Sequence, residues 1–253
     1  MIRQRTFGIA VAAVLAGLLF APVAAQAAGS GFPNQHAPVN LRDAVSLQRG
    51  AQLFVNYCMG CHSANHMRFN RLTEIGLTEE QIKEYLLFAT DKVGSPMTIA
   101  LRPADAKAWM GKAPPDMTVI ARAKRPDYIY TLLKSYYVDD SRALGWNNLA
   151  YPNIGMPHPL WQLQGNPQLK VEERESHGHM MQVKSTAPGD MPGTLNALEY
   201  DRAVGDLVNF LVYMGEPWKL QSHRIGIVVM FFLGILLVFV YLLKLEFWRD
   251  IKH

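Results

Sequence analysis

The segment Cys58-Met59-Gly60-Cys61-His62 decides how this chain is interpreted, because it has the form C-x-x-C-H. Two thiols at this spacing, followed at once by an imidazole, are the pattern for covalent attachment of a c-type haem. The thiols can form thioether links to one edge of the porphyrin, and His62 can then bind the iron. No other cysteine occurs in the 253 residues. The segment therefore predicts one haem c, held by Cys58, Cys61 and His62.

Other uses of a cysteine pair fit the sequence less well. A thioredoxin-like redox pair belongs next to a βαβ pattern, which this sequence does not show. A structural zinc site needs four ligands, usually in two pairs, and the sequence has no second cysteine pair. A secreted chain stabilised by disulfides would need more cysteines than two. Covalent haem attachment is the interpretation that remains.

The composition indicates a membrane protein and excludes a nucleic-acid-binding protein. Hydrophobic residues make up 49% of the chain and charged residues only 18%, whereas about 25% charged residues is usual. Residues 28–223 contain 19 Lys and Arg and 19 Asp and Glu. A region without net charge lacks the basic surface that nucleic acid requires. No Gly/Ser-rich linker divides this region, so one domain with its own core is expected.

The N-terminal residues have the pattern of a secretory signal peptide. Arg3 and Arg5 precede a short apolar stretch, and Ala25-Gln26-Ala27 follows it. This order of basic, apolar and small residues predicts export and cleavage after Ala27. An uncleaved membrane anchor is the alternative.

A second apolar run predicts a transmembrane helix near the C-terminus. Residues 225–243 carry no charge, and 19 helical residues can cross an apolar layer of about 30 Å. Cations follow this run, which places the C-terminus inside the cell. The predicted parts are a signal peptide (1–27), a periplasmic c-type cytochrome domain (28–223), a transmembrane helix (224–244) and a cytoplasmic tail (245–253).

Hydrophobic periodicity predicts that the exported domain is mainly helical. Asn40 is placed to cap a helix that leads into Cys58, with Asp43 in its first turn. Thr78 and Gln81 have the spacing of a capping box that opens a second helix. Further helices are predicted at residues 128–137 and 199–214.

Residues 141–193 are rich in Pro, Gly, Asn and His and show no sustained periodicity. They are expected to form long loops with one short strand at 181–184. Long loops are uncommon in a compact domain unless they serve a function, and wrapping a large cofactor is one such function. The acidic stretch 172–175 is expected to be an ordinary solvated loop. A docking patch for a basic partner is the alternative.

The sixth ligand of the iron decides whether the haem carries electrons or binds a substrate. Two methionines precede a proline that fixes the local backbone, Met156 and Met191. Met156 is favoured because its neighbours Ile154, Leu160 and Trp161 are apolar and could exclude water from the haem. Met191 stays the alternative at this point.

Histidine could replace methionine as the sixth ligand. His158, His177 and His179 would each allow ligation of the iron by two histidines. Each of them is instead expected to be an exposed loop histidine.

The haem propionates require cations or hydrogen-bond donors. A turn at Ala113-Pro114-Pro115-Asp116 precedes a basic cluster with a phenol beside it. The members of this cluster are Arg122, Lys124, Arg125 and Tyr128. A merely solvated basic face is the alternative interpretation.

On these residues the chain resembles the cytochrome c1 family, the haem-bearing subunits of cytochrome bc1 complexes. The resemblance covers most of the chain after the signal peptide and includes the C-terminal membrane helix. Its segments are Arg49-Gly50 and Leu53-Phe54 before the haem motif, Ala113-Pro114-Pro115-Asp116, Arg122-Ala123, Ile154-Gly155-Met156-Pro157, and residues 206–211 continuing to Glu216-Pro217.

The resemblance implies a mainly α cytochrome c fold with large loop insertions and one C-terminal transmembrane helix. It also implies that His62 and Met156 are the two axial ligands and that Cys58 and Cys61 form the thioethers. The residues that it places around the haem and its propionates are Pro115, Arg122, Lys124 and Tyr128.

The same resemblance implies an electron-transfer subunit that is not an enzyme by itself. Such a subunit accepts an electron from a Rieske iron-sulfur protein and passes it to a soluble or membrane-bound cytochrome c. It implies cytochrome b as a further partner, a dimeric complex, and a place in the bacterial inner membrane with the haem on the periplasmic side. The rivals are an anchored cytochrome that serves a terminal oxidase and a haem enzyme or gas sensor with five-coordinate iron.

Overall fold

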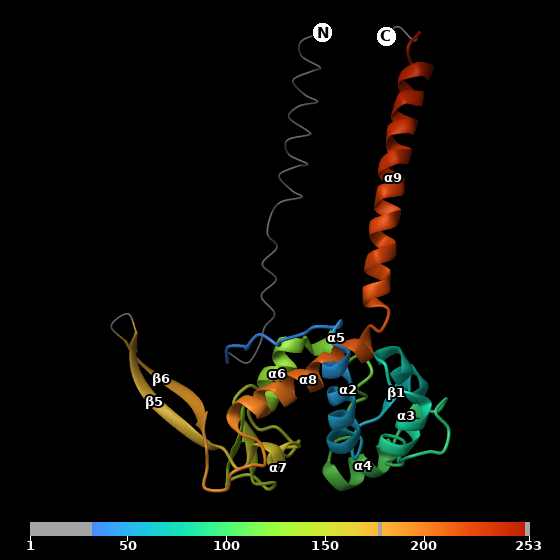
Figure 1. Ribbon diagram of the computed structural model, residues 1–253. Helices are drawn as coiled ribbons and strands as arrows, with labels where there is room; N and C mark the ends of the chain where they lie inside the picture. Colours follow the sequence, from blue (N-terminus) through green and yellow to red (C-terminus); the bar gives the residue numbers. More distant parts are fainter. Residues whose placement is uncertain (1–31, 177–178, 251–253) are drawn as a thin grey trace. The chain divides into compact units, whose positions relative to one another are not determined.

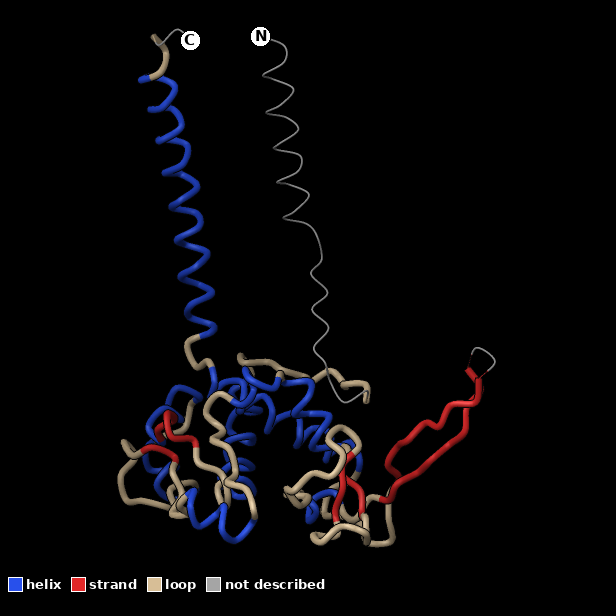
Figure 2. The backbone as a smooth tube through the Cα atoms, turned by 180° about the vertical axis from the view of Figure 1, so that it is seen from behind, coloured by secondary structure: helices blue, strands red, loops and turns tan. Residues whose placement is uncertain are grey.

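The computed structural model describes residues 32–176 and 179–250 (Figure 1). The predicted signal peptide and His177 lie outside the described residues. About half of the described chain is helical, and its strands form two-stranded antiparallel sheets, as Figure 2 shows in blue and red. The structure therefore confirms the mainly α class.

The elements follow one another along the chain, and the connection between residues 148 and 161 is a long loop. They are α2 (Ala44–Leu53), a π-helix (Phe54–Cys58), β1 (Ala64–Arg68), a 3-10 helix (Phe69–Ile75), α3 (Glu79–Tyr85), β2 (Pro96–Met97), α4 (Pro103–Met110), α5 (Ile120–Lys124), α6 (Pro126–Lys134), β3 (Tyr136–Val138), β4 (Trp146–Asn148), α7 (Trp161–Gln164), β5 (Gln168–Ser176), β6 (His179–Ala187), α8 (Ala197–Gly215) and α9 (Lys219–Phe247).

The packing of α2 against α8 forms the centre of the hydrophobic core. Phe54 and Phe210 bring their ring centroids to 5.8 Å, and both side chains are fully buried. Beside them, the guanidinium of Arg49 donates to both carboxylate oxygens of Asp206, at 2.5 and 3.2 Å. This contact fixes the helix that leads directly into the cysteine motif.

Gly50 permits the close approach of α2 and α8. A Cβ at this position would lie 2.7 Å from Phe210 Cβ and 2.8 Å from the Asp206 carbonyl carbon, and still closer to the Asp206 carbonyl oxygen. Because α8 backbone cannot yield as a side-chain tip can, Gly50→Ala should destabilise the domain by about 1–3 kcal/mol. Thermal unfolding followed by circular dichroism measures the loss.

Gly94→Ala is the matched control for this prediction. No heavy atom would lie within 4 Å of a Cβ at Gly94. The thermal unfolding midpoint of this variant should therefore stay near that of the parent protein. Equal midpoints for the two variants would show that the α2–α8 contact is not limited by Gly50.

The expectation that Asn40 caps the first helix is wrong. The cap is Asp43, whose carboxylate accepts from Ser46 N–H at 3.0 Å. The backbone of Asn40 is instead held by the buried Asn209 amide of α8, which accepts from Asn40 N–H at 3.0 Å and donates to Asn40 O at 2.9 Å. A contact between residues 169 positions apart thus holds the segment just before the helix.

Two other helices agree closely with the sequence. The Thr78 hydroxyl accepts from Gln81 N–H at 3.2 Å, and the Gln81 side chain accepts from Thr78 N–H at 2.9 Å, which confirms the predicted capping box of α3. The fourth predicted helix is confirmed as α8, which begins two residues earlier than expected and ends at Gly215.

The prediction of a helix over residues 128–137 extends past the observed end of the helix. α6 stops at Lys134, and Tyr136 begins β3, which pairs with β4. The Asn148 side chain donates to Leu132 O at 2.8 Å, so it satisfies a carbonyl at the end of the helix. The helix therefore ends before Tyr136 and Tyr137, which the predicted range had included.

The expectation of long loops in residues 141–193 is confirmed for residues 149–160 but is wrong for the segment that forms β5 and β6. β5 and β6, with nine residues each, form an antiparallel hairpin in continuous register. The pairing runs from Gln168 opposite Ala187 to Ser176 opposite His179. The strand predicted at 181–184 is only part of β6. The acidic stretch 172–175 lies in β5, where Glu172 pairs with Lys170 at 2.6 Å. It is thus part of a strand and not a loop.

α9 confirms a helix long and apolar enough to cross a membrane. Its candidate span, Gln221–Phe247, contains 27 residues and reaches a mean hydropathy of 3.0. At 1.5 Å per residue it is about 40 Å long, more than an apolar layer of about 30 Å requires. None of the span is buried against the rest of the described chain. These exposed side chains suit contact with lipid.

Candidate haem site

The cysteine motif follows a change in helical geometry at the end of α2. Phe54–Cys58 form a π-helix, and the motif continues from it in a turn where the N–H groups of Cys61 and His62 both donate to Cys58 O. Such single π turns often occur at functional sites. Cys58 packs against the core, whereas Cys61 is exposed. The two thiols are free and do not form a disulfide.

The His62 ring is held by one hydrogen bond. Its Nδ1 lies 2.8 Å from the Pro115 carbonyl oxygen. Because a carbonyl can only accept, Nδ1 carries the proton and the lone pair of Nε2 is left for a metal. Burial lowers the pKa of His62, against a smaller opposing effect of the Pro115 bond. His62 is therefore a neutral imidazole, which is the form that binds iron.

A second set of contacts ties the proline turn to the motif. Met117 N–H donates to Ser63 O at 2.8 Å. Asp116 accepts from the backbone N–H groups of Asn65 at 2.8 Å and Thr118 at 2.9 Å. Sequence reasoning identified the turn but missed Ser63 and the role of Asp116. The only local signal was an aspartate two residues before a threonine, the spacing of an Asx turn.

Burial also sets the state of the thiols. It raises the pKa of Cys58 to about 12, and the neighbouring Cys61 adds to this effect. Cys58 is therefore a protonated thiol at neutral pH, unlike the low-pKa thiolate of a redox catalyst. This protonation state argues against a thioredoxin-like redox pair.

The two candidate methionines differ in exposure. Met191 is 58% exposed, whereas Met156 is partly buried. Of the neighbours expected around Met156, Ile154 and Leu160 are buried, but Trp161 is half exposed. No hydrogen bond or ion pair in residues 32–176 and 179–250 joins Met156 to the motif.

His158 is buried and not exposed as expected. Only 2% of its surface is accessible. Its ring stacks on Tyr136 with centroids 4.7 Å apart and meets the rings of Trp146 and Tyr200 at 5.1 and 6.5 Å. Burial lowers the pKa of His158 to about 4, against a smaller opposing effect of Gln164. We conclude that it is a neutral packing residue directly behind the Met156 loop.

Because neither ring nitrogen of His158 has a hydrogen-bond partner among the described residues, phenylalanine can replace it. His158→Phe should change the stability by less than about 1 kcal/mol. His158→Ala should lower it by about 3–5 kcal/mol, because it empties a site enclosed by three rings. Chemical unfolding of the haem-loaded protein compares the two. A phenylalanine variant as unstable as the alanine variant would show that the imidazole is needed for its nitrogens.

The residues of the basic cluster differ in whether they already have a partner. Arg122 Nε lies 3.2 Å from a Glu216 carboxylate oxygen, so its charge is already paired. Lys124 is exposed and makes no ion pair within the described residues. Tyr128 is partly buried, and its pKa is raised by burial and by the nearby Tyr151. Lys124 and Tyr128 thus remain available to an anionic group.

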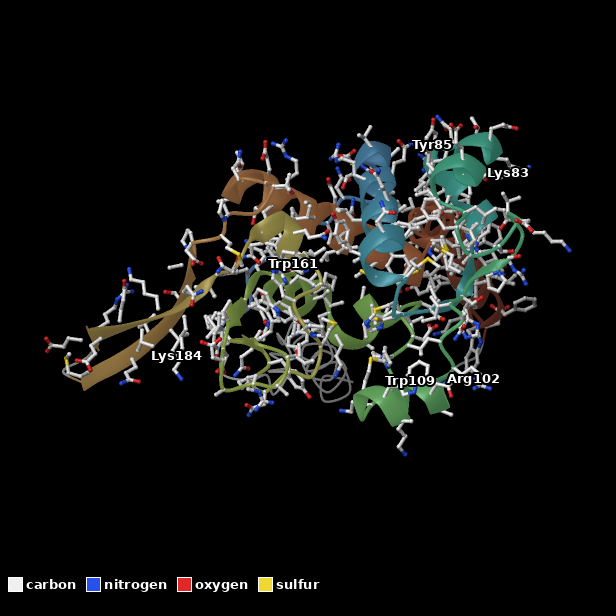
Figure 3. The ribbon with its side chains drawn as sticks, turned by 90° about the horizontal axis from the view of Figure 1, so that it is seen from below. Lys83, Tyr85, Arg102, Trp109, Trp161 and Lys184 are labelled. Atoms are coloured by element: carbon white, nitrogen blue, oxygen red, sulfur yellow. The ribbon has the colours of Figure 1, made fainter. Side chains whose placement is uncertain are left out.

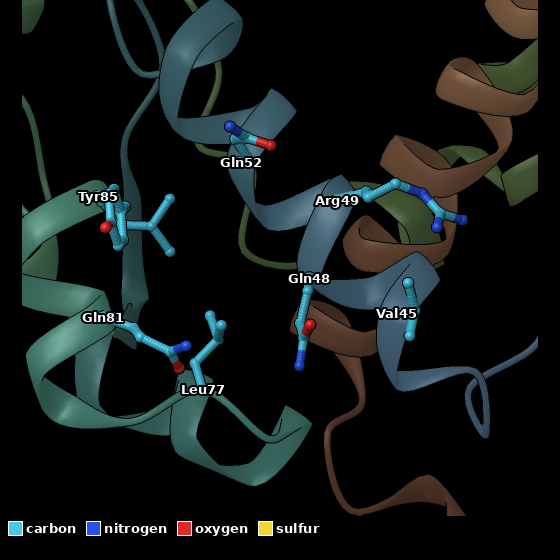
Figure 4. Close-up of a pocket in the computed structure, with 8 residues that line it drawn as sticks. Val45, Gln48, Arg49, Gln52, Leu77, Gln81 and Tyr85 are labelled. Atoms are coloured by element: carbon cyan, nitrogen blue, oxygen red, sulfur yellow. The ribbon is translucent and has the colours of Figure 1, made fainter.

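A surface pocket of about 270 Å³ lies elsewhere, between α2 and α3 (Figure 4). Three glutamines, Gln48, Gln52 and Gln81, contribute to its lining together with Tyr85. None of the predicted site residues lines this pocket. It therefore provides no support for a cofactor site.

The motif, the imidazole held by Pro115 and the long apolar helix together define a membrane-anchored c-type cytochrome. The sequence model of the Cytochrome C1 family matches residues 34–167. The chain is 45% identical to cytochrome c1 of Allochromatium vinosum, over 92% of this chain and 96% of the relative. It is 30% identical to cytochrome c1 of Rhodospirillum rubrum, over 83% of this chain and 84% of that one. The chain belongs to the cytochrome c1 family.

A further relative carries a different name. The ammonia monooxygenase gamma subunit of Nitrosomonas europaea is 44% identical, over 94% of this chain and 97% of the relative.

Members of the cytochrome c1 family carry one covalently bound haem c. The chain is accordingly a bacterial haem-carrying electron-transfer subunit of a cytochrome bc1 complex. Within the part of the chain that the structure describes, one helix, α9, is long and apolar enough to hold it in a membrane. It is thus one subunit of an oxidoreductase complex.

Proposed function

We propose that Cys58 and Cys61 would hold the haem through two thioethers and that His62 and Met156 would bind its iron. The observation that carries this proposal is the bond from His62 Nδ1 to the Pro115 carbonyl, which leaves Nε2 free for iron. When bound, the haem supplies one-electron Fe(III)/Fe(II) chemistry. Pro115 orients the imidazole, and Met156 as a second iron ligand would raise the reduction potential of the haem. Lys124 and Tyr128 are the proposed propionate contacts.

We further propose that the haem of this chain accepts an electron from a Rieske iron-sulfur protein and gives it to a cytochrome c. A partly buried site with two protein ligands suits this role, because it changes little between the two oxidation states. No acid or base group is needed for the transfer. The proposed partners are a cytochrome b and a Rieske subunit in a dimeric complex.

The proposed topology follows from the charges around α9. Lys244, Arg249 and Lys252 follow the apolar run, and an excess of cations marks the cytoplasmic side of a membrane helix. The domain at 28–223 would then be periplasmic after removal of residues 1–27, and the tail at 245–253 cytoplasmic. Protease added to intact spheroplasts should digest the domain and leave a tag on the tail protected.

Rapid mixing with ubiquinol tests the proposed donor. In the purified complex, ubiquinol should reduce the haem of this chain. After removal of the Rieske subunit that reduction should slow by more than about tenfold, because the electron loses its positioned donor. Unchanged reduction of the c-type haem without the Rieske subunit would exclude it as the donor.

A further inference from the structure

The outer face of α4 exposes two large apolar side chains. Trp109 is 74% exposed and Met110 is 49% exposed. Figure 3 labels Trp109 on α4 and Arg102 just before the start of that helix. Tryptophan is usually largely covered, and it is enriched in the centres of protein interfaces. The pair therefore has the character of a contact surface.

The charges around this pair are predominantly positive. Arg102 pairs with Asp105, with Nε and Nη2 at 2.6 and 3.1 Å from the two carboxylate oxygens. Lys107 and Lys112 make no ion pair within the described residues. Residues 101–125 contain six Lys and Arg and two Asp, although the domain as a whole is neutral.

The other charged residues of segment 101–125 reduce its positive charge but do not cancel it. Asp116 is occupied by the backbone N–H groups of Asn65 and Thr118. Arg122 is paired with Glu216. Lys124 and Arg125 add to the positive side.

Both ends of the segment that contains α4 are attached to the haem motif. Before the helix, Ile99 N–H donates to Ser63 Oγ at 3.1 Å. After it, the Pro115 carbonyl accepts from His62 Nδ1 at 2.8 Å. α4 itself has eight residues, about 12 Å in length. A protein bound to α4 is thus held next to the residues that carry the haem.

We propose that the surface formed by Lys107, Trp109, Met110 and Lys112, here called the α4 face, is where the electron acceptor docks, and that this acceptor is a soluble redox protein with an acidic surface. The inference rests on the proposed electron-transfer function. The lysines steer an acidic partner to the site, and Trp109 provides a compact apolar anchor. A small surface of this kind suits a partner that must dissociate after each transfer.

The test uses the purified complex with the full chain, reduced with dithionite so that docking is measured independently of the quinol reaction. Its oxidation is followed after mixing with an acidic or a basic soluble cytochrome c. The acidic acceptor should react faster, and its rate should fall with added salt. In the Lys107→Glu/Lys112→Glu variant the rate with the acidic acceptor should fall by about tenfold or more at low salt. Trp109→Ala should lower it at high salt as well.

Lys83→Glu/Lys184→Glu, on α3 and β6, is the matched control, since it makes the same change in net charge outside the α4 face. It should leave the rate within about twofold. A faster reaction with the basic acceptor, or equal rates for the Lys107→Glu/Lys112→Glu and Lys83→Glu/Lys184→Glu variants, would overturn the proposal. Slower reduction by ubiquinol with unchanged oxidation would also overturn it, because the α4 face would then serve the donor. Failure of ubiquinol to reduce the parent complex concerns the proposed function alone.

Discussion

Met156→Ala should leave the haem covalently attached but open one coordination position of the iron. The thioethers at Cys58 and Cys61 do not depend on Met156, so the c-type band persists. Loss of the thioether sulfur should lower the reduction potential by on the order of 100 mV or more. It should also allow the reduced protein to bind carbon monoxide. A potentiometric titration and a carbon monoxide difference spectrum measure both effects.

Met191→Ala is the matched control for this experiment, because it removes the exposed methionine that also precedes a proline. Its potential should equal that of the parent. If Met156→Ala keeps the parent potential and excludes carbon monoxide while Met191→Ala does not, the sixth ligand is Met191. Carbon monoxide binding by the parent protein would favour a haem enzyme or gas sensor instead.

His62→Ala should prevent the accumulation of a mature six-coordinate haem protein. The substitution removes the proposed iron ligand and the bond that ties the motif to Pro115. We expect the yield of haem-stained protein in membranes to fall by about tenfold or more, since loss of a bound group also removes its stabilising effect. Haem staining and immunoblotting of the same membranes separate loss of haem from loss of protein.

His66→Ala is the control, since this exposed histidine lies four residues further on and outside the motif. It should mature normally. Pro115→Ala provides a second comparison, because its carbonyl can still accept the His62 proton. A His62→Ala protein with a normal six-coordinate spectrum would refute the assignment of His62.

The parts of the fold that local rules control could be predicted from the sequence. The capping box at Thr78 and the end of α8 at Gly215 depend on residues a few positions apart. The long apolar run of α9 needs no partner to be recognised. The cysteine motif is equally local, because five consecutive residues define it.

The parts that depend on distant contacts could not be predicted in the same way. The Asn209 amide holds the backbone of Asn40, which therefore lies before the helix and is not its cap. The β5–β6 hairpin is exposed on both faces, and it therefore lacks the alternation of apolar and polar residues that marks a half-buried strand. His158 is buried by rings from separate elements of the chain.

The candidate site shows the same division. Its chemistry could be predicted, because Cys58, Cys61 and His62 identify the cofactor by type and spacing. Its supports could not, because the Pro115 carbonyl and Ser63 contribute backbone atoms that every residue possesses. The pairing of Arg122 with Glu216 was equally hidden from the sequence.

The most direct test of the central claim is a reduced-minus-oxidised visible spectrum of the complex purified from membranes through a tag on this chain. A bc1 subunit predicts b-type bands together with the c-type band, and ubiquinol should reduce both. A c-type band alone, from a preparation that retains other membrane subunits, would contradict the assignment. It would point to an anchored carrier or to a different assembly, such as the monooxygenase for which the Nitrosomonas europaea relative is named.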